Sequence, residues 1–266
     1  MDVGWGRCAP EAAYQFEKMH WREYQHVLDR TGVTEGTRYL DIACGSGLAM
    51  QLASERGALV SGLDASKRLV AIAKARTPEA DIRIGDMFNL PFEDHSFDVV
   101  TSCREIWGNC IDALREASRV VRPGGKIGLS FWGHQKKMQA YPLFKILGQA
   151  RQEERQNTTS IVSIGLPGVA EQLMADAGLR VGTRTSLKLH WEFPDADYAA
   201  HALASIGPAY LAIEHLGIDA FMEAVCEAAR AFYIEGIGIR TEVEVQCLIG
   251  VAPEADSKAL VASSVA

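Results

Sequence analysis

The chain has 266 residues, of which 48% are hydrophobic and 23% are charged. This composition is typical of a folded globular protein and excludes a disordered or fibrous one. Its 27 Lys and Arg residues against 34 Asp and Glu residues give a formal net charge of -7, which offers no attractive field to nucleic acid or to an anionic membrane surface. No window approaches the roughly 20 apolar residues that span a bilayer. The six cysteines contain no C-x-x-C pair, so we expect reduced thiols in the cytoplasm and no metal site.

The N-terminal part of the chain predicts one amphipathic helix within a helical segment of residues 1–35. Apolar residues recur at three-to-four spacing from Pro10 to about Arg30, and charged residues lie between them. Proline is well tolerated in the first turn of a helix, which fits Pro10 as its start.

Strands and helices are then predicted in alternation as far as Trp132. Ser66 is placed as the N-cap of one helix, and the sequence Arg122-Pro-Gly-Gly ends another because proline cannot extend a helix. Alternation with nearly continuous apolar strands indicates a doubly wound parallel sheet. The expected strands are 38–43, 59–64, 81–85, 97–102 and 126–132, and the expected helices are 48–56, 66–75 and 110–120.

The pattern changes beyond Trp132. We expect one domain over residues 1–266, with an α/β fold whose mostly parallel sheet has seven strands and carries helical cap insertions at 134–165 and 192–238. The later elements are a helix around 141–151, a helix at 169–177, a long alternating strand at 179–191, two or three helices at 196–233 and a last strand at 242–251.

A glycine turn follows the first predicted strand. Gly45 and Gly47 lie at its carboxyl end, where open α/β sheets bind ligands. The dinucleotide pattern G-x-G-x-x-G is not completed, because Met50 stands at the third position. Asp41, inside the turn, would repel a diphosphate but suits a ligand with positive charge.

Acidic residues also follow the next two strands. Asp64 comes 19 residues after Gly45, the spacing at which a carboxylate meets ribose hydroxyls. Asp86 and Met87 follow the third strand, where a carboxylate and a backbone N–H can meet the amino group and ring of adenine. Carboxylates at three successive strand ends predict an adenosine that carries positive charge, which describes S-adenosylmethionine.

Four segments, which together cover about residues 36–133, resemble the class I S-adenosylmethionine-dependent methyltransferases, close in style to the ubiquinone/menaquinone-biosynthesis type. They are LDIACGSG (family pattern LDxGCGTG), VSGLDAS, GDMFNLPFEDHSFDVV and LREASRVVRPGGKIGLSFW. The resemblance implies a Rossmann-like methyltransferase fold, with S-adenosylhomocysteine as the product. It also implies that the N-terminal helix closes over the cofactor, with Tyr14 or Trp21 near the methionyl end. The implied cofactor residues are Tyr14, Asp41, Ala43, Cys44, Gly45, Gly47, Asp64, Ala65, Asp86, Met87 and Ser102, with Ala43 at a position where the family often has glycine.

The acceptor is expected beside residues 101–109 and 131–135, at the ends of the fourth and fifth strands. Alignment and exclusion of water supply much of the catalysis of such a displacement, and a base is needed only if the acceptor is protonated. The candidate catalytic residues are His134, Arg104 and Glu105. The alternative for His134 is a solvent-facing loop position, and the alternative for Arg104 and Glu105 is a surface ion pair between them. Trp107, Trp132 and Tyr141 are candidates for an aromatic wall, with ordinary core packing as the equal alternative.

Missing motifs narrow the substrate. Ser102-Cys103-Arg104-Glu105 stands where an N-P-P-Y signature for amide or base nitrogen would lie, and the acidic triad that holds magnesium in catechol-type enzymes is absent. We predict methyl transfer to a small, largely apolar or aromatic molecule of secondary metabolism, with the methylated atom and a homodimeric assembly left open. The alternatives are an S-adenosylmethionine-binding cyclase without net transfer, a nicotinamide oxidoreductase, or a noncatalytic binding subunit.

Overall fold

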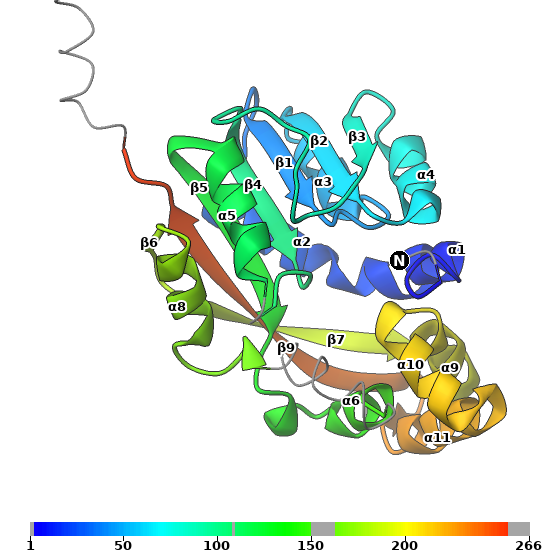
Figure 1. The fold of residues 1–266 in the computed structure, drawn as a ribbon. Helices are drawn as coiled ribbons and strands as arrows, with labels where there is room; N and C mark the ends of the chain where they lie inside the picture. Colours follow the sequence, from blue (N-terminus) through cyan, green and yellow to red (C-terminus); the bar gives the residue numbers. More distant parts are fainter. Residues whose placement is uncertain (1–2, 108–109, 150–162, 255–266) are drawn as a thin grey trace, which may run out of the picture.

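The computed structural model describes residues 3–107, 110–149 and 163–254. A mixed sheet with the order β3-β2-β1-β4-β5-β9-β6 forms its centre, and β7 and β8 pair with β9 outside this path (Figure 1). The strands in this part of the chain are β1 Arg38–Ile42, β2 Leu59–Asp64, β3 Asp81–Ile84, β4 Phe97–Cys103, β5 Val121–Trp132, β6 Arg180–Val181, β7 Thr185–Phe193, β8 Tyr233–Ile234 and β9 Gly238–Val251. The α-helices are α1 Ala9–Glu11, α2 Trp21–Thr31, α3 Leu48–Ser54, α4 Lys67–Arg76, α5 Ile111–Val120, α6 Tyr141–Leu147, α8 Val169–Asp176, α9 Ala196–Ala204, α10 Gly207–Leu216 and α11 Ile218–Arg230.

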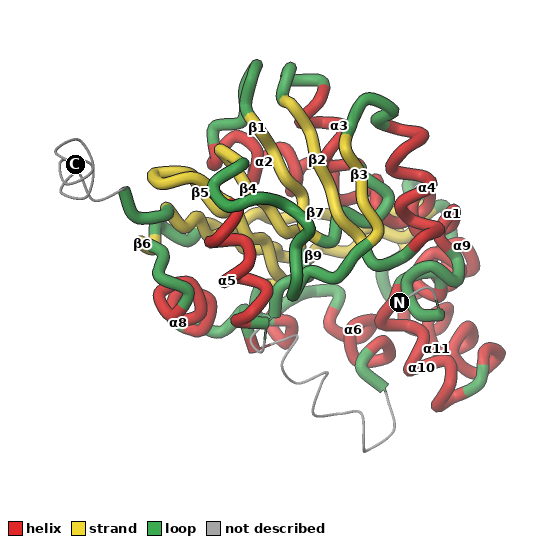
Figure 2. The backbone as a smooth tube through the Cα atoms, turned by 45° about the horizontal axis from the view of Figure 1, so that its top comes forward, coloured by secondary structure: helices red, strands yellow, loops and turns green. Residues whose placement is uncertain are grey.

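The parallel half of the sheet confirms the doubly wound prediction. Strands β3, β2, β1, β4 and β5 pair in parallel in that order, and Figure 2 shows β1, β2 and β3 side by side with α3 and α4 next to them. The Ser66 hydroxyl caps α4 by accepting the Leu69 N–H at 3.3 Å, as predicted. This topology brings the carboxyl ends of β1, β2 and β4 to one edge of the sheet.

The antiparallel half differs from its prediction. In the described residues the sheet has nine strands and not seven, and β9 pairs in antiparallel with β5, β6, β7 and β8, so the sheet is mixed and not mostly parallel. The short strand β8 was not predicted. The expected long strand at 179–191 is two strands, β6 and β7, which both pair with β9. The interruption falls at Gly182, whose N–H donates to the Ile249 carbonyl at 2.8 Å. The register also shifts by one residue across the break, from Val181 opposite Gly250 in β6 to Thr185 opposite Cys247 in β7, so one regular strand does not continue.

The N-terminal segment is not the single helix that the apolar spacing predicts. It runs through α1, a π-helical turn Ala12–Phe16, a 3₁₀ turn Glu17–His20 and then α2. A continuous α-helix would keep one apolar face, whereas these changes of pitch send neighbouring side chains in different directions. Phe16 and His20 face a buried aromatic group, and Glu17 faces the glycine turn.

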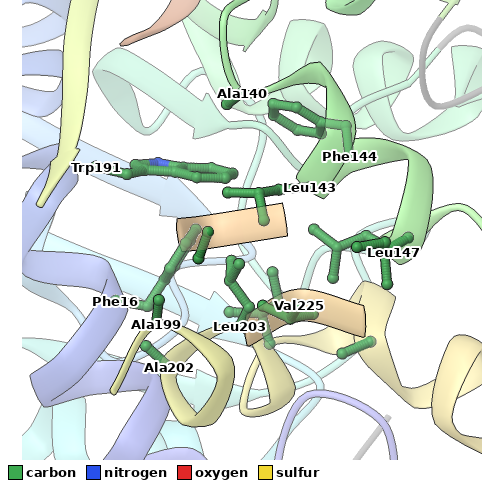
Figure 3. Close-up of a cluster of buried hydrophobic side chains, with 14 of the residues drawn as sticks. Phe16, Ala140, Leu143, Phe144, Leu147, Trp191, Ala199, Ala202, Leu203 and Val225 are labelled. Atoms are coloured by element: carbon green, nitrogen blue, oxygen red, sulfur yellow. The ribbon is translucent and has the colours of Figure 1, made fainter. Parts of the chain in front are cut away.

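A second apolar core lies beside the sheet, where α6, α9, α10 and α11 gather around the strands β7 and β9 (Figure 1). Figure 3 shows Trp191 from β7, Phe144 and Leu143 from α6, and Phe16 from the N-terminal segment pointing toward one another. The N-terminal segment and the later helices therefore share one core. Within the residues described, no helix combines the length and apolar character needed to cross a membrane.

Candidate active site

A cavity of about 570 Å³ lies at the carboxyl ends of β1, β2 and β4. The strand ends and the glycine turn form one wall, and the N-terminal segment lies opposite with Trp5, Phe16 and Tyr24. The loop between α9 and α10 completes the lining with Ile206, and Trp5 packs so closely on Gly207 that a Cβ there would overlap the indole ring. Residues distant in the sequence therefore enclose a ligand-sized space.

The glycine turn contains three residues in the left-handed region. Ala43 has a φ of 55°, Gly45 of 56° and Gly47 of 83°. A Cβ at Gly47 would lie 2.8 Å from Cβ of Ala73 on α4, so both backbone conformation and space require glycine at position 47. Ala43 adopts the same type of conformation at a cost of about 1–2 kcal/mol, because its Cβ lies close to the following carbonyl oxygen.

Asp64 holds this turn against the end of β2. Its carboxylate accepts the Gly45 N–H at 2.9 Å and the Ser66 N–H at 2.7 Å, and it also lines the cavity. Charge-assisted bonds of this kind are stronger than neutral ones. Asp64 therefore fixes the shape of the cavity wall and presents negative charge to its interior.

Asp41 is almost fully buried under the turn. Its Oδ1 accepts the Thr101 hydroxyl at 2.7 Å, and the Tyr39 phenol lies 2.6 Å from the Thr101 oxygen. Burial raises the pKa of Asp41 to about 7, against the opposing effect of the Thr101 hydrogen bond. A cation in the cavity would favour the ionised form of this carboxyl.

Asp86 and Met87 follow β3 and also line the cavity. The Asp86 carboxylate accepts the Phe88 N–H at 3.0 Å, an arrangement that orders the loop in an Asx turn. The exposed Phe88 side chain extends this part of the wall. This end of the cavity is apolar with one carboxylate at its rim.

An ion pair connects the N-terminal segment to the glycine turn. Glu17 accepts the Ser46 hydroxyl and Arg76 Nη1, each at 2.5 Å, and Arg76 also donates to the carbonyls of Ser46 and Ala13. Sequence reasoning missed Glu17 and Arg76, because their meeting depends on how α4 and the N-terminal segment pack. No local pattern marks either of them.

Glu23, on α2, has three buried partners. Its Oε1 accepts Arg104 Nε at 3.1 Å and the Ser130 hydroxyl at 2.5 Å, and its Oε2 lies 2.8 Å from His20 Nδ1. Although burial favours the neutral acid, the Arg104 guanidinium and the His20 hydrogen bond hold the pKa of Glu23 down at about 2. Arg104 is therefore part of a buried network, and not of the surface ion pair with Glu105 that the sequence left open.

Glu105 follows in the chain and lines the cavity beside Cys103. Burial raises the pKa of Glu105 to about 8, and the nearby Arg104 offsets only part of this effect. A carboxyl group with a pKa near neutrality can accept or donate a proton at physiological pH.

The structure brings most of the predicted cofactor residues to the cavity and leaves several other candidates outside it. Asp41, Ala43, Cys44, Gly45, Asp64, Ala65, Asp86 and Met87 line it. Gly47 lies within the turn, Ser102 is buried behind the wall, and Tyr14 and Trp21 are largely exposed on the outside. Among the described residues, Arg104 and Glu105 line the cavity, whereas His134, Trp107, Trp132 and Tyr141 do not.

Each candidate outside the cavity has another environment. Trp132 makes edge-to-face contacts with Trp191, Phe144 and His20, and Tyr141 packs on the second core. The Trp107 indole N–H donates to the Arg104 carbonyl at 3.0 Å. His134 lines a separate pocket of about 450 Å³ with charged residues of β7 and β9. Asn109, part of the expected acceptor floor, lies outside the described residues.

Comparison with known proteins identifies the family of this chain. Residues 40–129 match the family model of a methyltransferase domain. The demethylmenaquinone methyltransferase of Renibacterium salmoninarum is 30% identical over 190 residues, which cover 70% of this chain and 72% of that protein. The chain belongs to the class I S-adenosylmethionine-dependent methyltransferases. The methyltransferase thus uses the positively charged cofactor that the strand-end carboxylates predict.

Solved structures confirm the fold at lower sequence identity. A geranyl diphosphate methyltransferase in complex with S-adenosylmethionine has a TM-score of 0.54 and 17% identity, and the match covers 90% of this methyltransferase and 88% of that chain. The [4+2]-cyclase SpnF has a TM-score of 0.55 and 20% identity, and covers 88% and 81% of the two chains. The fold is therefore shared by enzymes that differ in chemistry.

We expect S-adenosylmethionine to bind this methyltransferase more tightly at pH 7.5 than at about pH 6. The pKa values of Asp41 and Glu105, about 7 and about 8, lie in or near this window, and a cationic ligand favours their ionised forms. Binding should therefore release protons. Titration calorimetry in two buffers of different ionisation enthalpy measures the number of protons released. Asp41→Asn should reduce the release. A pH-independent affinity without proton release would contradict the electrostatic role of these carboxyls.

Proposed function

We propose that this methyltransferase methylates a small, largely apolar acceptor that carries no anionic group. This proposal rests on the charge of the cavity. Its acidic lining residues are Glu17, Asp41, Asp64, Asp86 and Glu105, and Arg104 is the one basic side chain among the described residues that line it. Glu17 is paired with Arg76 and Arg104 with Glu23. A phosphate or carboxylate on the acceptor would therefore face the carboxyl groups of the other four acidic residues, and Arg104 is not free to pair with it.

The same charge supports a position for the cofactor. We assign Asp64 to the ribose, Asp86 and Met87 to the adenine, and Asp41 with the glycine turn to the methionyl part, because these residues line one continuous wall. S-adenosylmethionine supplies a methyl group already activated on a sulfonium. Carboxylates around a sulfonium and an ammonium group are favourable in a cavity of low dielectric.

The opposite part of the cavity suits an apolar acceptor. Trp5, Ala12, Phe16, Tyr24 and Ile206 line it, and all except Trp5 are buried. We propose that the N-terminal segment and the helices α9 and α10 act as a cap that excludes water from this space. Glu105 is then placed to remove a proton from a hydroxyl or amine of the acceptor.

The test measures release of S-adenosylhomocysteine with pairs of acceptors that differ in charge. Simple phenols, hydroquinones and aromatic amines are compared with their phosphorylated or carboxylated counterparts. Turnover with uncharged members alone supports the proposal, and preferential use of the anionic members contradicts it. Conversion of an acceptor without release of S-adenosylhomocysteine would instead indicate a cyclase-type or rearrangement reaction.

Glu105→Gln is expected to lower kcat by about 10²-fold or more for an acceptor that must lose a proton, because general base catalysis typically contributes this much. Affinity for S-adenosylhomocysteine, which lacks the sulfonium charge, should change little, since the residues assigned to the ribose and adenine are intact. His134→Ala is the control and should leave kcat unchanged, because His134 lies in the other pocket. The opposite ranking of the two variants would move the base from Glu105 to His134.

A further inference from the structure

The turn after β4 has an unusual backbone. Arg104 has a φ of 70°, in the left-handed region that residues other than glycine rarely occupy. The Arg104 N–H donates to the Ser130 carbonyl at 2.8 Å, and its carbonyl accepts the Trp107 indole N–H at 3.0 Å. Strained backbone of this kind persists only where surrounding contacts determine it.

The Arg104 side chain supplies further contacts, all with α2 or the aromatic group beside it. Its Nε donates to Glu23 at 3.1 Å, its Nη2 donates to the Tyr24 phenol at 2.7 Å, and its guanidinium lies 5.5 Å from the ring centre of Trp132. Glu105 is the next residue and makes no ion pair with Arg104 in the described structure. The conformation of Arg104 thus determines where Glu105 points.

His20 extends this network to the second core. Because the Glu23 carboxylate can only accept and the Trp191 indole can only donate, His20 carries its proton on Nδ1 and accepts the Trp191 N–H on Nε2 at 3.4 Å. Burial and the Arg104 guanidinium lower the pKa of His20 to about 4, which fits the neutral ring. His20 therefore fixes Glu23 from the side opposite Arg104.

We propose that Glu23 and His20 are positioning residues, which act through Arg104 to hold Glu105 toward the acceptor. This inference rests on the role of Glu105 in the proposed function. Neither Glu23 nor His20 lines the cavity. Both would therefore affect the reaction only through Arg104 and Glu105.

The test compares Glu23→Gln, Glu105→Gln and the double variant in the full-length enzyme. Glu23→Gln keeps the shape of the side chain but removes the charge that holds Arg104. We expect kcat with an uncharged acceptor to fall by about tenfold or more, with affinity for S-adenosylhomocysteine nearly unchanged. In the Glu105→Gln background, Glu23→Gln should cause no further loss of kcat beyond about twofold, because both act on one step.

The pH profile of kcat, measured in folded enzyme, provides a second readout. A variant that only loses stability would leave this profile unchanged. Unpaired Arg104 charge and loss of the Glu23 charge both favour ionised Glu105, so the apparent pKa should move to lower pH in Glu23→Gln. Glu171→Gln is the matched control, since Glu171 pairs with Arg184 away from the cavity. It should leave the profile unchanged.

The outcomes separate the two claims. If Glu105→Gln leaves kcat unchanged, the role of Glu105 fails and the positioning proposal fails with it. Two results would overturn only the positioning proposal while Glu105→Gln lowers kcat. In the first, Glu23→Gln leaves kcat unchanged. In the second, the losses of kcat in the two single variants multiply fully in the double variant. Should Glu23→Gln not fold, His20→Gln replaces it. A loss of kcat is expected from it that does not add to the loss in the Glu105→Gln background, with the apparent pKa unchanged because Glu23 keeps its charge and its pair with Arg104.

Discussion

Asp64→Ala is expected to weaken binding of S-adenosylmethionine by roughly 1–3 kcal/mol. The variant removes the proposed partner of the ribose hydroxyls. It also leaves the N–H groups of Gly45 and Ser66 without the carboxylate that they share, so the glycine turn loses one of its connections to β2. Titration calorimetry of the folded variant measures the loss directly.

The control for this prediction is Asp81→Ala, at the exposed amino end of the neighbouring strand β3. Asp81 pairs with Arg83 and does not line the cavity, so cofactor affinity should stay at the wild-type value. Unchanged affinity in Asp64→Ala, with normal folding, would remove Asp64 from the site. Equal losses in both variants would point to a general effect on stability.

Arg104→Ala is expected to destabilise the fold by about 3–5 kcal/mol, the usual cost of leaving one partner of a buried ion pair alone. Its partner Glu23 is 1% exposed. Without the guanidinium, this buried carboxylate keeps only His20 and Ser130 as partners. Denaturant unfolding at neutral pH measures the difference in the free energy of unfolding.

The pH dependence of this difference tests its cause. In the wild-type protein the pKa of Glu23 is lowered to about 2 from an ordinary value of 4.5, so its stabilising contribution is present above pH 4.5 and is lost as the pH falls through about 2. In Arg104→Ala the carboxyl should instead take up a proton readily, and the deficit should shrink as the pH falls from 7 toward 4.5. Arg115→Ala, which breaks an exposed pair with Asp112, should cost less than about 1 kcal/mol at either pH.

The parts of the molecule that follow local rules could be predicted from the sequence. The parallel strands are buried on both faces and therefore have nearly continuous apolar runs, and Ser66 caps its helix through a contact three residues away. Asp41, Asp64 and Asp86 each follow a strand. Because parallel strands end at one edge, their order along the chain was enough to bring them to one cavity.

The rest depends on packing between distant segments. Trp5 and Ile206 are about 200 residues apart, and Glu17 meets Arg76 only because the N-terminal segment lies across α4. Apolar spacing also cannot distinguish an aromatic side chain that faces a ligand from one that faces a core, as Trp132 illustrates. The changes of helical pitch before α2 follow from such contacts, and a regular apolar repeat gives no sign of them.

A crystal structure of the protein with S-adenosylhomocysteine tests the central claim most directly. The account predicts that the ribose hydroxyls lie within hydrogen-bonding distance of the Asp64 carboxylate, that the adenine lies beside Asp86 and Met87, and that the sulfur faces the part of the cavity that Glu105 lines. A ligand in the pocket beside His134, or an adenosine in the 570 Å³ cavity without contact to Asp64 and Asp86, would contradict it.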